Sequence, residues 1–192
     1  MTEIISDIAF TPAVKAAQQK RGSRENYARM EQGSGWQHEV TPELAAFIGE
    51  RDSIYLGTAS GDGQPYIQHR GGPKGFVKIV DKKTLGFVDF IGNAQYISLG
   101  NLEENNKAFI FFMDYPNRRR IKMWGTSEVI EDDDVLLHRL TNGKYEARPQ
   151  RSFLFHLEAW DANCPKHILP RWTEADVAPI VDDLKSRVME LE

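Results

Sequence analysis

The chain has 192 residues, 41% of them hydrophobic and 27% charged, and its net charge is -4 at pH 7. This length supports one well-buried core and is short for two ordinary domains, so we expect a single domain over 1–192. The slightly acidic balance is typical of a soluble protein. It argues against a nucleic-acid partner, because nucleic-acid binding usually requires a basic excess.

Cysteine content and hydropathy predict the compartment. The single cysteine, Cys164, cannot form an internal disulfide, and residues 1–10 lack the basic start and long apolar run of a secretory signal. The longest aliphatic and aromatic run, 108–113, is far shorter than the roughly 20 residues that cross a bilayer. We therefore expect a cytoplasmic protein with no membrane partner.

The first part of the chain, 1–51, is predicted to be a helical N-terminal extension. Thr11, Ser23 and Thr41 each stand directly before a helix-forming segment, as cap residues do. From Ser53 the pattern changes to short β-prone runs separated by turns. Such runs are found at 53–59, 66–70, 76–81, 85–90, 107–114, 119–130 and 151–160.

These runs predict an antiparallel sheet, interrupted by a short helix near Ile97–Leu102. No regular alternation of strand and crossover helix is present, so a small barrel is favoured over a parallel α/β sheet. We expect a mainly β fold with flanking helices (α+β), its barrel over 52–171. A C-terminal helix is predicted over 172–192, where Thr173 and Asp176 can form a capping box.

The segment 159–171 holds Cys164 three residues before His167. A zinc site would need further ligands that no second motif supplies, so no metal is expected. A thiolate nucleophile would need a base, and Pro165 does not hold the two side chains together. The interpretation we favour is that Cys164 is a small packing residue.

Three other segments carry candidate anion-binding groups. Arg118, Arg119 and Arg120 open a strand in which Arg118 and Arg120 would share one face, although such a run also suits a solvated strand end. The strand ending in Arg70 enters a Gly-Gly-Pro-Lys-Gly turn that could bind phosphate, although glycine-rich turns are common in hairpins. The third segment contains Asn93, Gln95 and Asn101, which flank a short helix and suit a phosphate, a ribityl chain or ordinary helix capping.

In this order, the segments from Ser53 to Arg171 resemble the pyridoxamine 5'-phosphate oxidase-like family of FMN-binding split barrels. The resemblance rests on "SIYLGTAS", "QHRGG", "GFVKIVDKKTLGFVDF", "GN", "NLEENNKAFIFF" and "RRRIKMWGTSEV" taken in register. It implies a six-stranded antiparallel split β-barrel that forms a homodimer, with FMN bound in clefts between the subunits.

The resemblance also nominates residues of a cofactor site. His69, Arg70, Gly71 and Gly72 match the strand end that contacts the isoalloxazine and phosphate, and Asp89 and Phe90 match the flavin edge. Where the family has a basic pair for the phosphate, this chain has Ala94 and Gln95. The phosphate would then rely on hydrogen bonds from Asn93 and Gln95 and on the charge of Arg70, Lys74 or the arginine run. Arg120 matches a flavin-pyrimidine contact, with Trp124 nearby.

In the tail, the resemblance implies that Trp160 and Arg171 approach the flavin and substrate from the partner subunit, together with Lys166 and His167. The Tyr, Arg and Ser trio that holds the vitamin's phosphate in the true oxidase has no match in 131–150. The resemblance therefore implies an FMN-dependent oxidoreductase acting on another small molecule. An F420-, FAD- or haem-binding barrel and a non-catalytic flavin sensor or carrier remain as alternatives.

Overall fold

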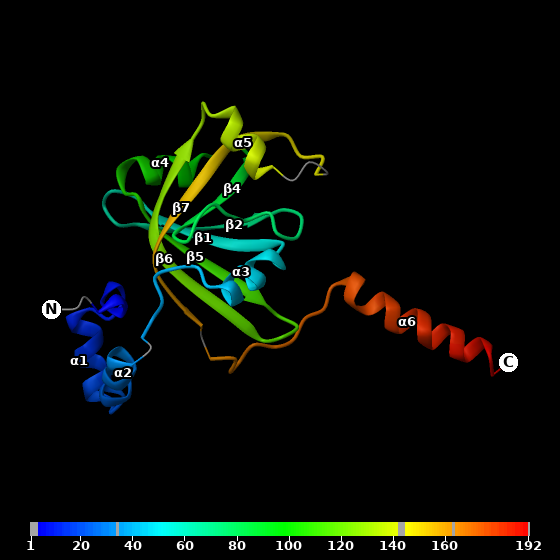
Figure 1. The fold of residues 1–192 in the computed structure, drawn as a ribbon, viewed down its shortest axis with the longest axis horizontal. Coiled ribbons are helices and arrows are strands. Elements are labelled where there is room, and N and C mark those ends of the chain that lie inside the picture. The colour runs from blue at the N-terminus through cyan, green and yellow to red at the C-terminus, as the bar shows by residue number, and fades with distance from the viewer. Residues whose placement is uncertain (1–3, 34, 142–144, 163, 192) are drawn as a thin grey trace.

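The computed structural model describes residues 4–33, 35–141, 145–162 and 164–191. Its centre is one antiparallel sheet with the strand order β2-β1-β5-β6-β7-β4-β3, curled into a barrel (Figure 1). The strands are β1 (Ser53–Ala59), β2 (Pro65–Gly71), β3 (Lys78–Ile79), β4 (Thr84–Phe90), β5 (Lys107–Asp114), β6 (Arg119–Ile130) and β7 (Pro149–Ala162).

The predicted split-barrel class is confirmed, with one difference in the number of strands. The sheet has seven strands rather than six, because the two-residue β3 pairs with β4 at the edge. The long strands β6 and β7 pair over most of their length, and their register shifts between Trp124 and Gly125. An added Cβ at Gly125 would lie 2.0 Å from the carbonyl oxygen of His156, so this bulge requires glycine.

The core lies inside the barrel, where alternate strand residues point inward. On β5, Ala108, Ile110, Phe112 and Asp114 are buried, while the intervening residues are more exposed. Helix α3 (Pro42–Gly49) closes one side by burying Leu44, Phe47 and Ile48 against this core. The barrel therefore gives the strands fixed inner and outer faces, and this decides where each candidate side chain points.

The remaining helices lie outside the barrel (Figure 1). Helices α4 (Ile97–Glu104) and α5 (Asp134–Leu140) lie near one end, while the 3-10 helix η1 (Ile5–Ile8), α1 (Pro12–Lys20) and α2 (Arg24–Gln32) form a separate group near β6. Trp36 links that group to the sheet, because its ring contacts Phe10 and stacks on Trp124 with centroids 4.6 Å apart.

The predicted caps agree with the structure at most helix starts. Thr11 and Thr41 accept backbone hydrogen bonds at the starts of α1 and α3, and Thr173 forms a capping box with Asp176 at the start of α6 (Glu174–Met189). Ser23 precedes α2 but makes no capping bond. Helix α6 stands away from the barrel (Figure 1), and every residue from 171 to 191 is exposed. Among the described helices, none combines the length and apolar character needed to cross a bilayer.

Candidate functional site

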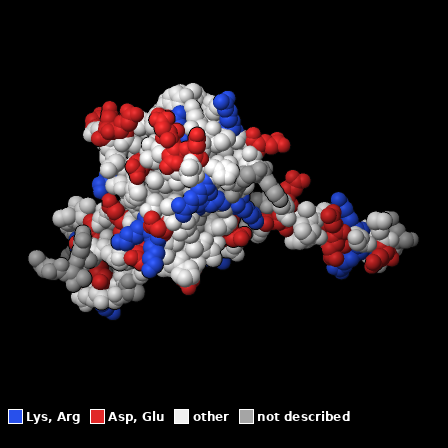
Figure 2. Space-filling view, turned by 45° about the horizontal axis from the view of Figure 1, so that its top comes forward, with Lys and Arg blue, Asp and Glu red and all other residues white. Residues whose placement is uncertain are grey.

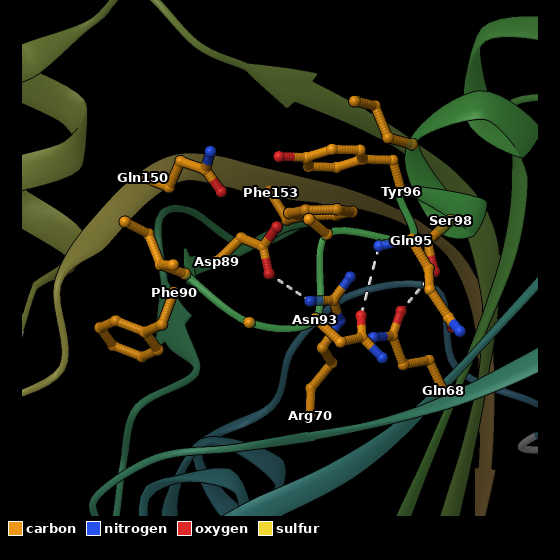
Figure 3. Close-up of a pocket in the computed structure, with 14 residues that line it drawn as sticks. Gln68, Arg70, Asp89, Phe90, Asn93, Gln95, Tyr96, Ser98, Gln150 and Phe153 are labelled. Atoms are coloured by element: carbon orange, nitrogen blue, oxygen red, sulfur yellow. Dashed lines mark hydrogen bonds and ion pairs between the residues drawn. The ribbon is translucent and has the colours of Figure 1, made fainter.

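A cavity of about 500 Å³, here called the first cavity, opens between β2, the end of β4 and the start of α4. Ligand pockets are commonly of this size. Figure 3 shows Phe90 and Gln150 at one end of it and Gln68 and Ser98 at the other, with Arg70 and Asp89 pointing toward each other between them. Its lining residues are Gln68, Arg70, Asp89, Phe90, Ile91, Gly92, Asn93, Ala94, Gln95, Tyr96, Ser98, Leu99, Gln150 and Phe153.

Strand alternation decides which residues of β2 reach the first cavity. Gln68 and Arg70 are partly buried on the inner face, whereas His69 is exposed on the outer face, opposite Tyr55 of β1. Neighbours in a strand point to opposite sides, so His69 and Arg70 cannot both face the same ligand within one subunit. The structure thus separates two residues that the sequence analysis assigned to one site.

An ion pair between Arg70 and Asp89 forms the polar centre of the first cavity. Nη1 of Arg70 donates to Oδ1 of Asp89, and the Arg70 guanidinium lies 5.0 Å from the ring centroid of Phe153. Both charged side chains are about 15% exposed. A cation held between a carboxylate and an aromatic face is rigid. The centre of the cavity is therefore preorganised for an anion or a polar ligand.

The loop from β4 to α4 supplies amide and hydroxyl groups. The backbone N–H of Gln95 donates to Oδ1 of Asn93 at 3.3 Å, and the hydroxyl of Ser98 donates to Oε1 of Gln68 at 2.9 Å. Ala94 and Tyr96 both have positive φ, 55° and 53°. These conformations are uncommon for residues with a Cβ and bring the Tyr96 ring to the cavity.

A second cavity of about 340 Å³ lies on the outer face of the sheet, against the tail that follows β7. Its lining residues are Tyr55, Phe111, Met113, Tyr115, Arg120, His167, Ile168, Leu169 and Arg171. The Arg171 guanidinium stacks 4.6 Å from the ring centroid of Tyr115. Arg120 and Arg171 make this cavity basic, His167 lies beside them, and the walls are largely aromatic and aliphatic.

Two tyrosines at the second cavity, Tyr55 and Tyr115, interact through their hydroxyl groups. The hydrogen bond and charge of Tyr115 raise the pKa of the Tyr55 hydroxyl above its ordinary value, burial adds to the rise, and the charge of Arg171 opposes it. Tyr55 also contacts the ring of His69, with centroids 5.7 Å apart. His69 therefore belongs beside the second cavity rather than in the first.

Several nominated residues lie outside both cavity linings. Gly71 and Gly72 shape the turn after β2, and an added Cβ at Gly72 would meet Cβ of Phe76 at 2.7 Å. The Lys74 ammonium is exposed, 3.8 Å from Glu50, and the amide of Asn101 donates to the Thr58 hydroxyl at 3.0 Å. At these positions the contacts observed within the chain are structural.

The two nominated tryptophans also make structural contacts. Trp124 stacks on Trp36, and Nε1 of Trp160 donates to the carbonyl of Glu39 at 2.8 Å. These contacts attach the segment before α3 to the sheet. Trp160 lies seven residues after the cavity residue Phe153 on the long strand β7. One part of this strand therefore lines the first cavity, while another part attaches the segment before α3.

Two expectations about the polar segments were wrong. Cys164 is exposed rather than packed in the core, because it lies in the irregular segment that leaves the sheet after β7. Arg118 does not share a strand face with Arg120, because Arg118 occupies the preceding turn with φ 52°. Lys166 is exposed in a turn beside His167. Among the described residues, no three His, Cys, Asp or Glu side chains gather as a metal site.

Sequence reasoning missed several cavity residues. Gln68 is two positions before Arg70, so the strand period itself indicated that both face one side. The cavity residues Gln150 and Phe153 come from β7, which pairs with β4, and so does Arg151, which lies against Asp89 without lining the cavity. No local motif signals these three, because their place depends on pairing between segments about 60 residues apart. Tyr55 and Tyr115 were missed for the same reason.

Charge is unevenly distributed over the surface. Figure 2 shows Lys and Arg side chains gathered across the middle of one face of the barrel, with Asp and Glu grouped above them. The net charge of -4 thus conceals a local basic region. Such a region attracts small anions more strongly than the average charge suggests.

Comparison with known families gives the classification. Residues 40–164, well over half of the chain, match the profile of the family described as pyridoxamine 5'-phosphate oxidase. The chain belongs to the pyridoxamine 5'-phosphate oxidase family. This confirms the resemblance seen in the sequence. The matched region includes the first cavity and most of the second, but ends before His167 and Arg171.

Solved structures of this family and its relatives support the same fold. HupZ of Group A Streptococcus aligns with a TM-score of 0.52 at 19% identity, covering 69% of this chain and 99% of that one. A protein of Lactobacillus delbrueckii described as a candidate pyridoxamine 5'-phosphate oxidase aligns with a TM-score of 0.50 at 21% identity, covering 65% of this chain and 95% of that one. None of the curated proteins matches the chain. At these identities the likeness establishes the fold.

Proposed function

We propose that this family member is an FMN-binding flavoprotein that acts as an oxidoreductase on a small molecule. The observation that carries the proposal is the first cavity, which combines a mostly buried arginine, five amide or hydroxyl side chains and three aromatic rings in about 500 Å³. A flavin nucleotide has a matching set of parts: a phosphate, a polyhydroxyl chain and a planar ring.

The cavity residues suit these parts in distinct ways. Arg70 would pair with the phosphate, and its Nε is buried without a hydrogen-bond partner in the protein. Asn93 and Gln95 would donate hydrogen bonds through their amides, and Phe90, Tyr96 and Phe153 offer surfaces for an aromatic ring. When bound, FMN would supply hydride or electron transfer, while the protein binds, orients and excludes water.

The proposal includes a homodimer with the cofactor at the subunit interface. The two cavities of one subunit lie on opposite faces of the sheet, so residues such as Arg70 and Arg171 can meet one ligand only if they come from different copies. Helix α6 offers a surface for the second copy, because its exposed apolar residues recur at helical spacing. They are Val177, Ile180, Val181, Leu184 and Val188.

In this arrangement the second cavity binds the substrate. Its cationic or titratable groups are Arg120, His167 and Arg171. Lys166 directly precedes His167 in the chain. An anionic group of a small aromatic or apolar substrate would pair with Arg171, which Tyr115 holds by stacking.

The test is a flavin spectrum. The purified protein should carry flavin or bind added FMN with micromolar affinity, and NADH or NADPH should bleach the bound flavin. Titrations with FAD, F420 and haem test the other ligands of the fold. Preference for one of these over FMN would replace the cofactor assignment, and binding of none would overturn the proposal. FMN that binds but resists reduction would indicate a sensor or carrier.

A further inference from the structure

A cluster of buried charges lies behind the first cavity, where three strands meet. Asp89 of β4 is the register partner of Arg151 of β7, and the Asp89 carboxylate also pairs with Arg70 of β2. Oδ1 of Asp89 accepts from Arg70, while Oδ2 lies 3.8 Å from Nε of Arg151. Nη1 of Arg151 lies 3.0 Å from Glu131, completing the cluster.

The cluster has more buried positive than buried negative charge. The side chains of Arg151, Asp89 and Arg70 are 5%, 14% and 15% exposed, whereas Glu131 is 57% exposed and screened by water. Two buried guanidinium groups therefore share one buried carboxylate. Nε of each arginine has no hydrogen-bond partner in the protein. Buried charge of this kind is costly unless it is paired, so the cluster favours a further negative charge beside it.

We propose that Arg151 is a positioning residue that makes the first cavity select a phosphomonoester, here the phosphate of FMN. This inference rests on the proposed function. It accounts for the missing basic pair at Ala94 and Gln95, because the positive charge comes from another strand. Arg151 does not itself line the cavity. It acts by engaging one oxygen of Asp89, which would otherwise neutralise Arg70 completely.

The ring of Tyr96 packs on the Arg151 guanidinium and supports this effect. It lies 5.1 Å over the Arg151 guanidinium and also lines the cavity. The ring excludes water from the cation, so the charge is screened less and acts over a longer distance. The phosphate would then sit beside Arg70, with the charge of Arg151 behind it.

The test compares FMN with riboflavin, which lacks the phosphate, by quenching of flavin fluorescence. Wild-type protein should bind FMN more tightly than riboflavin, and Arg151→Met should reduce the ratio of the two affinities by about tenfold, because the buried charge behind the phosphate is lost. Arg151→Lys should recover part of the ratio. An unchanged ratio in Arg151→Met would overturn the inference while leaving FMN binding intact.

A matched control separates this role from simple loss of a buried ion pair. Arg51 is also mostly buried, lies 3.3 Å from Asp114 and has an unpartnered Nε, but its partner Asp114 does not line the first cavity, whereas Asp89, the partner of Arg151, does. Arg51→Met should lower stability and leave the FMN-to-riboflavin ratio unchanged. An equal fall of the ratio in both variants would contradict a specific role of Arg151.

Two further measurements still test the inference if Arg151→Met folds poorly or if the protein binds no flavin. Glu131→Gln removes an exposed carboxylate next to Arg151 and should raise the ratio by roughly two- to threefold. Inorganic phosphate alone should raise the Tm of wild type and of Arg51→Met, but not of Arg151→Met. No rise in wild type, or an equal rise in Arg151→Met, would overturn the inference, even if FMN binding itself had failed.

Discussion

The first cavity is built from strands of one sheet and the loop between β4 and α4, whereas the second is completed by a tail that has left the sheet. In the first, Arg70 and Asp89 are mostly buried and held from two strands. In the second, Arg171 is exposed and held by a single stacking contact with Tyr115. The first cavity is therefore preorganised within one chain. The shape of the second cavity depends on what packs against its exposed tail.

The largest effect should come from breaking the charge cluster of the first cavity. Asp89→Ala leaves two buried guanidinium groups without their shared carboxylate, so the free energy of unfolding should fall by about 3–5 kcal/mol. Urea denaturation measures this change. Glu158→Ala, which breaks the exposed pair with Lys107, should cost less than about 1 kcal/mol. Similar losses in both variants would show that the cluster is not effectively buried.

The next effect tests whether the second cavity needs a second copy. Deleting residues 173–192 should weaken the proposed dimer by roughly a hundredfold or more, because several exposed apolar side chains are lost together. Light scattering should then show a monomer whose barrel remains folded. Leu184→Asp should act in the same direction, whereas Asp183→Ala, beside it on α6, should stay dimeric. A dimer unaffected by the deletion would contradict this use of α6.

A smaller effect is expected from the tail itself. Arg171→Ala should leave flavin content nearly unchanged but slow bleaching of the flavin by NADH or NADPH roughly tenfold, the range of one charged hydrogen bond. Stopped-flow absorbance measures the rate. Cys164→Ser, in the same exposed tail, is the control and should match wild type. Equal losses in the two variants would point to the thiol instead.

The smallest effect is a pH dependence at the second cavity. The raised pKa of Tyr55 means that the folded state favours its neutral hydroxyl. The resulting stability is fully present below the unfolded pKa of about 10 and is lost as pH rises through the higher folded value. Tyr115→Phe should bring the titration of Tyr55 back toward lower pH, measured by tyrosinate absorbance. Tyr66→Phe should leave that titration in place.

Local pattern was sufficient for much of the fold. The turns and alternating runs predicted the strands, and Thr11, Thr41 and Thr173 predicted helix starts, because caps and strand periodicity depend on neighbours in the chain. The predicted run at 76–81 was too long, because the strand formed there, β3, has two residues and a single partner at the sheet edge.

The candidate site divides in the same way. The order of motifs along the sequence was enough to identify the family and to nominate Arg70, Asp89 and Asn93, which the structure brings together. The strand period puts His69 and Arg70 on opposite faces, but only the tertiary structure placed His69 beside Tyr55 and Arg151 behind Asp89. Those placements depend on which strands pair and how the sheet curls, and the energies that fix them come from contacts between segments far apart in the chain.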